Sequence, residues 1–195
     1  MTVRILTVCT GNICRSPYAE RVLAHRLEAV RPGAFEVTSA GTGALVGEGV
    51  DPGSARHLAS RQIGHSDFAA RQLSERILAE IDLVIPMTVE HRKTVLSYTP
   101  RLLKRAYTLK ELARLIESAE QAQPWRERLA GLTTPEERWR AIPQHLARER
   151  GRTRVETGVD DIADPYRLSA EKFALMAEEV DVAVERVVAL EASFS

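Results

Sequence analysis

The sequence predicts a doubly wound α/β fold, in which a parallel sheet carries helices on both faces. Two observations support this prediction. Short apolar runs typical of buried strands alternate with longer segments in which apolar residues recur every three or four positions, as they do along one face of a helix. Turns that contain glycine or proline separate the two kinds of segment.

Strands are expected at residues 3–8, 35–39, 81–85 and, more briefly, 105–107, and helices at 17–30, 51–62 and 89–97. Thr108 and Glu111 form a capping-box pattern, which predicts a further helix that runs to about residue 120. The last helix has one apolar stripe, which should pack on the sheet and consists of Phe173, Met176, Val180, Val184 and Val187.

Residues 121–157 interrupt the alternation. This segment contains Trp125, Trp139 and three prolines, and its apolar residues follow helical spacing with no convincing strand. Eight arginines and only four glutamates lie between residues 124 and 154, but no recognisable nucleic-acid-binding motif accompanies them, so we do not expect a nucleic-acid partner. We interpret the chain as a single domain, residues 1–195, with a helical insertion at about 121–157.

Composition excludes several classes of protein. The formal net charge is zero, no apolar run is long enough to cross a bilayer, and the first residues are too briefly apolar for a signal peptide. The only two cysteines lie five positions apart, and a disulfide between them could not stabilise a fold of 195 residues. We therefore expect a protein of the reducing cytoplasm without a membrane segment.

Both cysteines belong to the stretch V-C-T-G-N-I-C-R-S-P at residues 8–17, which joins the first strand to the first helix. Ligands of open α/β sheets bind at this edge. Ser16 is a suitable N-cap and Pro17 a suitable first helical residue, so the amides of residues 10–15 can turn inward beside the positive end of the helix. Gly11 and Asn12 tolerate the left-handed backbone that such a loop requires. The loop is therefore predicted to bind a tetrahedral oxyanion.

Within this loop, Arg15 can bind two phosphate oxygens at once, and its charge favours the thiolate form of Cys9. A thiolate there is placed to attack phosphorus and form a cysteinyl-phosphate, a reaction that needs no metal or other cofactor. The alternative is that Cys9 and Cys14 are small buried residues beside a structural turn. Protonation of the leaving oxygen requires an acid, and Asp160, Asp161 and Asp164 are the candidates, although turns and caps alone would also explain aspartates there.

These motifs resemble those of the low-molecular-weight protein tyrosine phosphatases. Members of that family carry V-C-x-G-N-x-C-R-S-P after the first strand and D-P-Y before the last helix, and D-P-Y stands here at residues 164–166. Shorter matches are S-A-G-T at 39–42, D-P at 51–52, A-R-x-L at 70–73 and D-L-V-I at 82–85. The resemblance covers residues 3–120 and 158–190, and it implies a flavodoxin-like fold with a four-stranded parallel sheet.

The resemblance also implies the site. Cys9 would be the nucleophile, Arg15 the phosphate-binding arginine, and Asp164 the acid that later activates water. The other predicted site residues are Thr10, Gly11, Asn12, Ile13, Cys14 and Ser16 in the loop, Leu45 and Tyr166 as cleft walls, and Ser39 as a support for Asn12. Cys14 would be a redox neighbour that traps oxidised Cys9 as a disulfide.

The expected activity is metal-independent hydrolysis of phosphotyrosine in proteins. Ile13 favours phosphotyrosine, because related arginine phosphatases have threonine at that position. Met87-Thr88 with His91, and the run Y-T-L-K-E at 107–111, are instead similar to the arginine phosphatases, and Arg167 adds a positive charge after D-P-Y. Three alternatives remain: a protein arginine phosphatase, an arsenate reductase that uses the same loop, and a non-catalytic phosphate-binding module.

Overall fold

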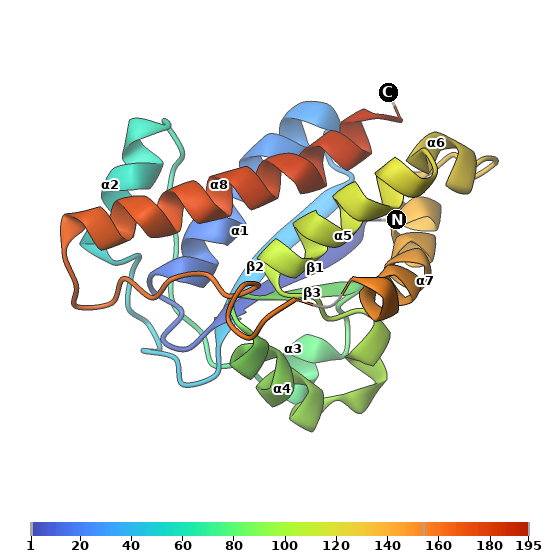
Figure 1. Cartoon of the computed structure of the whole chain (residues 1–195). Helices are drawn as coiled ribbons and strands as arrows, with labels where there is room; N and C mark the ends of the chain where they lie inside the picture. The colour runs from blue at the N-terminus through green and yellow to red at the C-terminus, as the bar shows by residue number, and fades with distance from the viewer. Residues whose placement is uncertain (1, 154, 195) are drawn as a thin grey trace.

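The computed structural model describes residues 2–153 and 155–194 and contains one parallel sheet (Figure 1). Its strands are β1 (Val3–Cys9), β2 (Phe35–Gly41) and β3 (Leu83–Pro86), in the order β2-β1-β3. β1 is central, and its side chains are buried on both faces, with Ile5 on one side and Leu6 on the other. The alternation of apolar runs and helical segments thus gives the expected α/β architecture.

Helices cover both faces of this sheet (Figure 1). One side carries α1 (Arg15–Val30), α2 (Pro52–Ser60), α5 (Leu109–Ala122) and α8 (Ala170–Ala192), and the other carries α3 (Glu75–Leu78), α4 (Val89–Tyr98) and the 3-10 helix η1 (Pro100–Lys104). α8 packs on α1 and α5, whereas we expected it to pack directly on the sheet. Its apolar stripe fills the groove between those two helices.

The expected fourth strand is wrong for this chain, since the sheet of the described residues has three strands. At residues 105–107 a single parallel bridge forms between Val84 and Ala106, with the Val84 amide 2.8 Å from the Arg105 carbonyl. η1 ends at Lys104, and Thr108 already caps α5. Only residues 105–107 lie between η1 and the N-cap of α5, and this segment is too short to form a ladder of strand hydrogen bonds.

The expected start of the first helix is also corrected. α1 begins at Arg15 with Cys14 at the N-cap position, and Ser16 does not act as the cap. The Ser16 hydroxyl is instead engaged by neighbouring loop side chains, described below. At α2 the predicted start holds to within one residue, because Asp51 is the N-cap and accepts the Gly53 amide at 2.8 Å.

The segment 121–157 contains α6 (Trp125–Arg128) and α7 (Pro135–Arg152). α7 is held to α8 through Glu191, a fully buried carboxylate that binds Arg138 and accepts the Trp139 indole N–H at 3.0 Å. Arginines of this segment are thus used inside the fold. In the described part of the chain, no helix combines the length and apolarity required to span a bilayer.

Candidate active site

The loop between β1 and α1 turns its amides toward one concave space. The carbonyls of Thr10, Gly11 and Ile13 point away from that space and accept the amides of Gly43, Leu45 and Asp51 at 2.8 to 3.0 Å. Because C=O and the next N–H point in opposite directions across a planar peptide, the following amides face inward. Among the described residues, the amides of 11–14 have no protein acceptor. They lie beside the N-terminus of α1, as an anion site requires.

Asn12 fixes the loop. It is fully buried and adopts φ 56°, the left-handed conformation that its sequence position suggested. Its Nδ2 donates to the hydroxyls of Ser16 at 2.9 Å and Ser39 at 2.8 Å, and its Oδ1 accepts the Arg71 amide at 2.9 Å. Ser39 in turn donates to Glu20 at 2.6 Å. The strained residue is therefore held by three hydrogen bonds from a buried polar network.

The two cysteines have different surroundings. Cys9 Sγ lies 3.0 Å from Ser16 Oγ, and that oxygen also accepts the side-chain Nδ2 of Asn12, so the Ser16 hydroxyl hydrogen can be donated to a Cys9 thiolate, which cannot donate itself. Cys14 is also buried, and burial raises the pKa of its thiol above the ordinary value, with the negative charge of Asp51 as the next cause. Cys14 therefore stays a neutral thiol while Cys9 has a hydrogen-bond donor that stabilises a thiolate.

Arg15 and Asp164 meet at the opening of this concave space. Arg15 Nη2 lies 2.7 Å from Asp164 Oδ2, and its Nη1 lies 3.5 Å from the Ile162 carbonyl. The arginine side chain is 6% exposed and the aspartate 53%, so a buried cation is paired with a carboxylate that solvent reaches. Arg15 Nε is buried and has no acceptor among the described residues. The guanidinium can therefore bind a further anion.

A cavity of about 210 Å³ contains these groups. Leu45 and Tyr166 are partly exposed and form two of its walls. Gly43, which the sequence analysis did not select, also lines it, and a side chain at that position would begin 3.9 Å from the Thr10 methyl group. The full lining is Cys9, Thr10, Gly11, Ile13, Cys14, Arg15, Gly43, Leu45, Asp164 and Tyr166. Asn12, Ser16 and Ser39 lie outside this lining and brace the loop.

Comparison with known proteins gives the family. Residues 4–133 match the family model described as low molecular weight phosphotyrosine protein phosphatase. The chain belongs to this family. The low-molecular-weight phosphatase Wzb of Escherichia coli K12 is 41% identical over 98 residues, which are 50% of this chain and 63% of Wzb. The probable phosphatase EpsP of Ralstonia nicotianae is 34% identical over 129 residues, 66% of this chain and 83% of EpsP. The chain thus matches less than two thirds of the length of Wzb.

Solved structures of low-molecular-weight phosphatases share the fold. The enzyme from T. tengcongensis superposes with a TM-score of 0.68 at 25% identity, covering 96% of this chain and 99% of its own. The YwlE arginine phosphatase of Geobacillus stearothermophilus has a TM-score of 0.65 at 24% identity, covering 96% and 91%. The flavodoxin-like class predicted from the sequence is therefore confirmed, although the sheet is one strand smaller than expected.

Of the three aspartates that precede the last helix of the chain, only Asp164 lines the cavity. The Asp160 carboxylate binds Arg114 at 2.8 Å. Asp161 accepts the Val89 amide at 2.7 Å. The structural interpretation that the sequence allowed for all three therefore fits Asp160 and Asp161, and Asp164 alone is available to a bound ligand.

His91 is a site neighbour that sequence reasoning mentioned only for its resemblance to arginine phosphatases. Its Nε2 lies 2.9 Å from Thr10 Oγ1 and its Nδ1 2.8 Å from Thr88 Oγ1. Burial, and after it the positive charge of Arg15, together lower the pKa of His91 to about 4. A neutral imidazole therefore supports the loop between β1 and α1 through Thr10. No local sequence pattern predicts this role.

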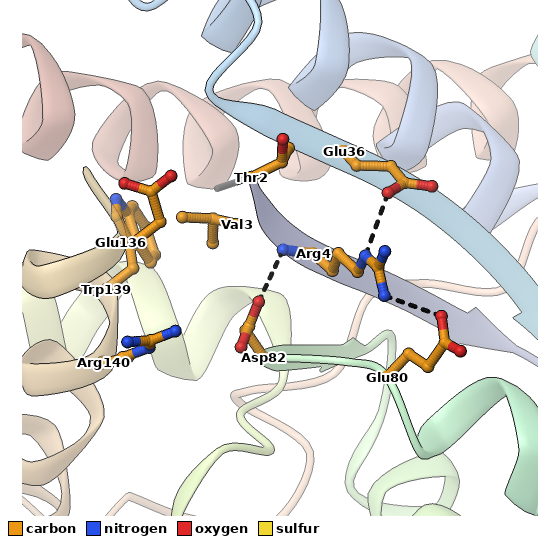
Figure 2. Close-up of a pocket in the computed structure, with 9 residues that line it drawn as sticks. All are labelled: Thr2, Val3, Arg4, Glu36, Glu80, Asp82, Glu136, Trp139 and Arg140. Atoms are coloured by element: carbon orange, nitrogen blue, oxygen red, sulfur yellow. Dashed lines mark hydrogen bonds and ion pairs between the residues drawn. The ribbon is translucent and has the colours of Figure 1, made fainter. Parts of the chain in front are cut away.

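A larger cavity of about 420 Å³ lies at the other end of β1 (Figure 2). Its central charge, Arg4, is already paired with Glu80 at 2.7 Å and Glu36 at 3.3 Å, and its amide donates to Asp82 at 3.0 Å. Among the described residues, no group of three or more potential ligands is placed to hold a metal ion. This cavity contains no nucleophile and is not the candidate site.

Proposed function

We propose that this protein is a metal-independent phosphatase that hydrolyses phosphotyrosine in proteins through a cysteinyl-phosphate intermediate. One observation carries the proposal: Cys9, the loop residues Gly11 and Cys14 with their inward amides, Arg15 and Asp164 line a single cavity. A nucleophile, an oxyanion site and an acid are the three components that this reaction needs.

In the first step, the Cys9 thiolate attacks phosphorus and the bond between phosphorus and the tyrosine oxygen breaks. The loop amides and Arg15 hold the three equatorial oxygens, where negative charge is spread in the transition state. Asp164 gives its proton to the departing phenolic oxygen. Asp164 is paired with Arg15 before substrate binds, and the incoming phosphate displaces this carboxylate from the guanidinium.

In the second step, water attacks phosphorus of the cysteinyl-phosphate. Asp164, now a carboxylate, takes a proton from that water, and the bond between phosphorus and sulfur breaks. Inorganic phosphate leaves, and the sulfur returns as a thiolate. Ser16, 3.0 Å away, donates to this thiolate and makes it a better leaving group.

The cavity walls support an aryl phosphate as the substrate. Ile13, Leu45 and Tyr166 present apolar surface around the oxyanion site, which suits a phenyl ring. A phosphoguanidinium group would bring N–H donors that need acceptors. Among the described residues, Asp164 is the only carboxylate that lines the cavity, which favours the aryl phosphate.

Both cysteines are free thiols, which supports the expectation of a reducing, cytoplasmic compartment.

The test is hydrolysis of matched phosphotyrosine and phosphoarginine peptides without added metal. We expect turnover of the phosphotyrosine peptide, none with Cys9→Ser, and a fall in kcat/KM of about 10²- to 10⁴-fold with Asp164→Asn. Asp161→Asn is the matched control, because asparagine retains the oxygen that accepts the Val89 amide. Preference for phosphoarginine would reassign the substrate, and an inactive wild-type protein would overturn the proposal in favour of a phosphate-binding module.

A further inference from the structure

The residues directly before Asp164 are attached to the start of α5 and to Met87, which follows β3. Thr108 Oγ1 donates to the Asp160 carbonyl at 2.8 Å, and Lys110 Nζ lies 3.1 Å from the Asp161 carbonyl. The Ile162 amide donates to the Met87 carbonyl at 2.8 Å, and Ile162 is 1% exposed. The backbone from 160 to 162 is therefore held in place directly before the acid.

Arg114 makes the strongest of these attachments. Its Nε and Nη2 bind the two carboxylate oxygens of Asp160 at 3.2 and 2.8 Å, a bidentate geometry that fixes orientation as well as distance. Both side chains are largely shielded from solvent, at 27% and 11% exposure. Such a pair is worth more than an exposed ion pair, because water and salt screen it less.

The same guanidinium also reaches the end of α7. Arg114 Nη1 lies 3.1 Å from the Thr153 carbonyl and 3.0 Å from its hydroxyl, and Thr153 is the C-cap residue of α7. Three residues earlier on each helix, Arg150 of α7 binds Glu111 of α5 at 2.6 and 2.8 Å. Segment 121–157 is thus joined to the acid-bearing loop through α5.

We propose that Arg114 is a positioning residue for Asp164, because it ties the acid-bearing loop to α5 and to the end of α7. When substrate phosphate binds Arg15, Asp164 loses this partner. The position of the acid then depends on the hydrogen bonds and ion pairs made by residues 160–162. Arg114 touches neither substrate nor the reacting atoms, and it acts only through Asp160. This inference rests on the proposed phosphatase function.

The test compares kcat/KM for aryl phosphates whose leaving groups need protonation to different degrees. In Arg114→Gln we expect kcat/KM for phenyl phosphate, a poor leaving group, to fall about tenfold, which is less than the full contribution of a general acid. For 2,4-dinitrophenyl phosphate, whose phenolate leaves without a proton, the fall should be less than threefold. The rate of Cys9 alkylation by iodoacetate should not change, because the phosphate loop is untouched.

Three further variants make the test decisive. Asp160→Asn should reproduce the effect, the double variant should lose no more than either single variant, and Arg114→Lys should recover part of it. Arg186→Gln is the control, since Arg186 of α8 pairs with Glu117 of α5 and, within the described part of the chain, not with the loop. Equal losses on both substrates, or no loss, would overturn the positioning role.

A second measurement separates the failure of this inference from failure of the proposed function. Amide hydrogen exchange at residues 160–164 should become faster in Arg114→Gln and stay unchanged in Arg186→Gln. If the wild-type protein hydrolyses no aryl phosphate, the proposed function fails while exchange still tests the attachment. If exchange does not respond to Arg114→Gln, the attachment itself is refuted.

Discussion

His91 provides a prediction that links the phosphate loop to stability. The ring is 7% exposed and sits between Thr10 and Thr88, with its backbone amide donating to Thr88 Oγ1 at 3.2 Å. Burial lowers its pKa from 6.5 to about 4, the charge of Arg15 acts in the same direction, and the carboxylates of Asp164, Asp161 and Glu90 oppose the shift.

The sign of the effect follows from which state binds the proton. Below pH 6.5 the unfolded chain takes up a proton at His91 and the folded chain does not, so the free energy of unfolding falls as pH falls. Each pKa unit corresponds to about 1.4 kcal/mol. From pH 7.5 to 5 this one side chain should therefore cost about 2 kcal/mol of stability, and the loss should stop increasing below pH 4, the folded-state value.

The assay is urea unfolding of the wild-type protein and His91→Gln at pH 7.5 and pH 5. Glutamine retains an N–H that can donate to Thr10 but cannot titrate, so the wild type should lose about 2 kcal/mol more than the variant between the two pH values. His25→Gln, an exposed position on α1, is the control and should keep the wild-type dependence. Equal pH dependence in wild type and His91→Gln would refute the reasoning.

Two further outcomes follow from contacts already described. Ser16→Ala removes the donor 3.0 Å from Cys9 Sγ and should lower kcat/KM about 10- to 100-fold, with slower alkylation of Cys9 by iodoacetate at pH 6; an unchanged alkylation rate would refute the assigned donor. Gly53→Ala places a methyl group 2.5 Å from the Phe173 ring between α2 and α8 and should cost about 1 to 3 kcal/mol. Thermal unfolding should show a lower Tm for Gly53→Ala than for Gly49→Ala, where nothing lies within 4 Å of the added atom.

The geometry of the loop between β1 and α1 could be predicted because its parts are local. Cys9, Arg15 and the start of α1 lie within a few residues, and spacing alone brings a strand end, an anion-binding loop and a helix N-terminus together. The same local logic predicted the left-handed Asn12, since asparagine tolerates that conformation in a tight loop. The alternation of strands and helices likewise predicted the fold class without any long-range information.

The errors arose where contacts of individual side chains or the lengths of flanking elements decide the outcome. Ser16 is a residue type that favours the N-cap, but Asn12 and Cys9 engage its hydroxyl, and the helix begins two residues earlier than expected. Residues 105–107 have the apolar character of a strand, but the helical elements on both sides reduce the pairing to one bridge. Arg114 and Asp160 lie 46 residues apart, and no periodicity or spacing rule indicates such a pair.

The Arg15 to Asp164 pair connects binding to catalysis. The Asp164 carboxylate pairs with the buried Arg15 guanidinium. In the proposed mechanism a phosphate group takes the place of this carboxylate on Arg15, so the acid is released when the phosphate binds. Asp164 would then retain the Tyr166 amide at 3.2 Å and the attachments of the preceding residues. A loop held only by Arg15 would lose its attachment at the moment the acid acts. The contacts of Arg114 with Asp160 and Thr153 do not involve Arg15, and in the proposed positioning role they keep the acid at the leaving oxygen while Arg15 binds phosphate.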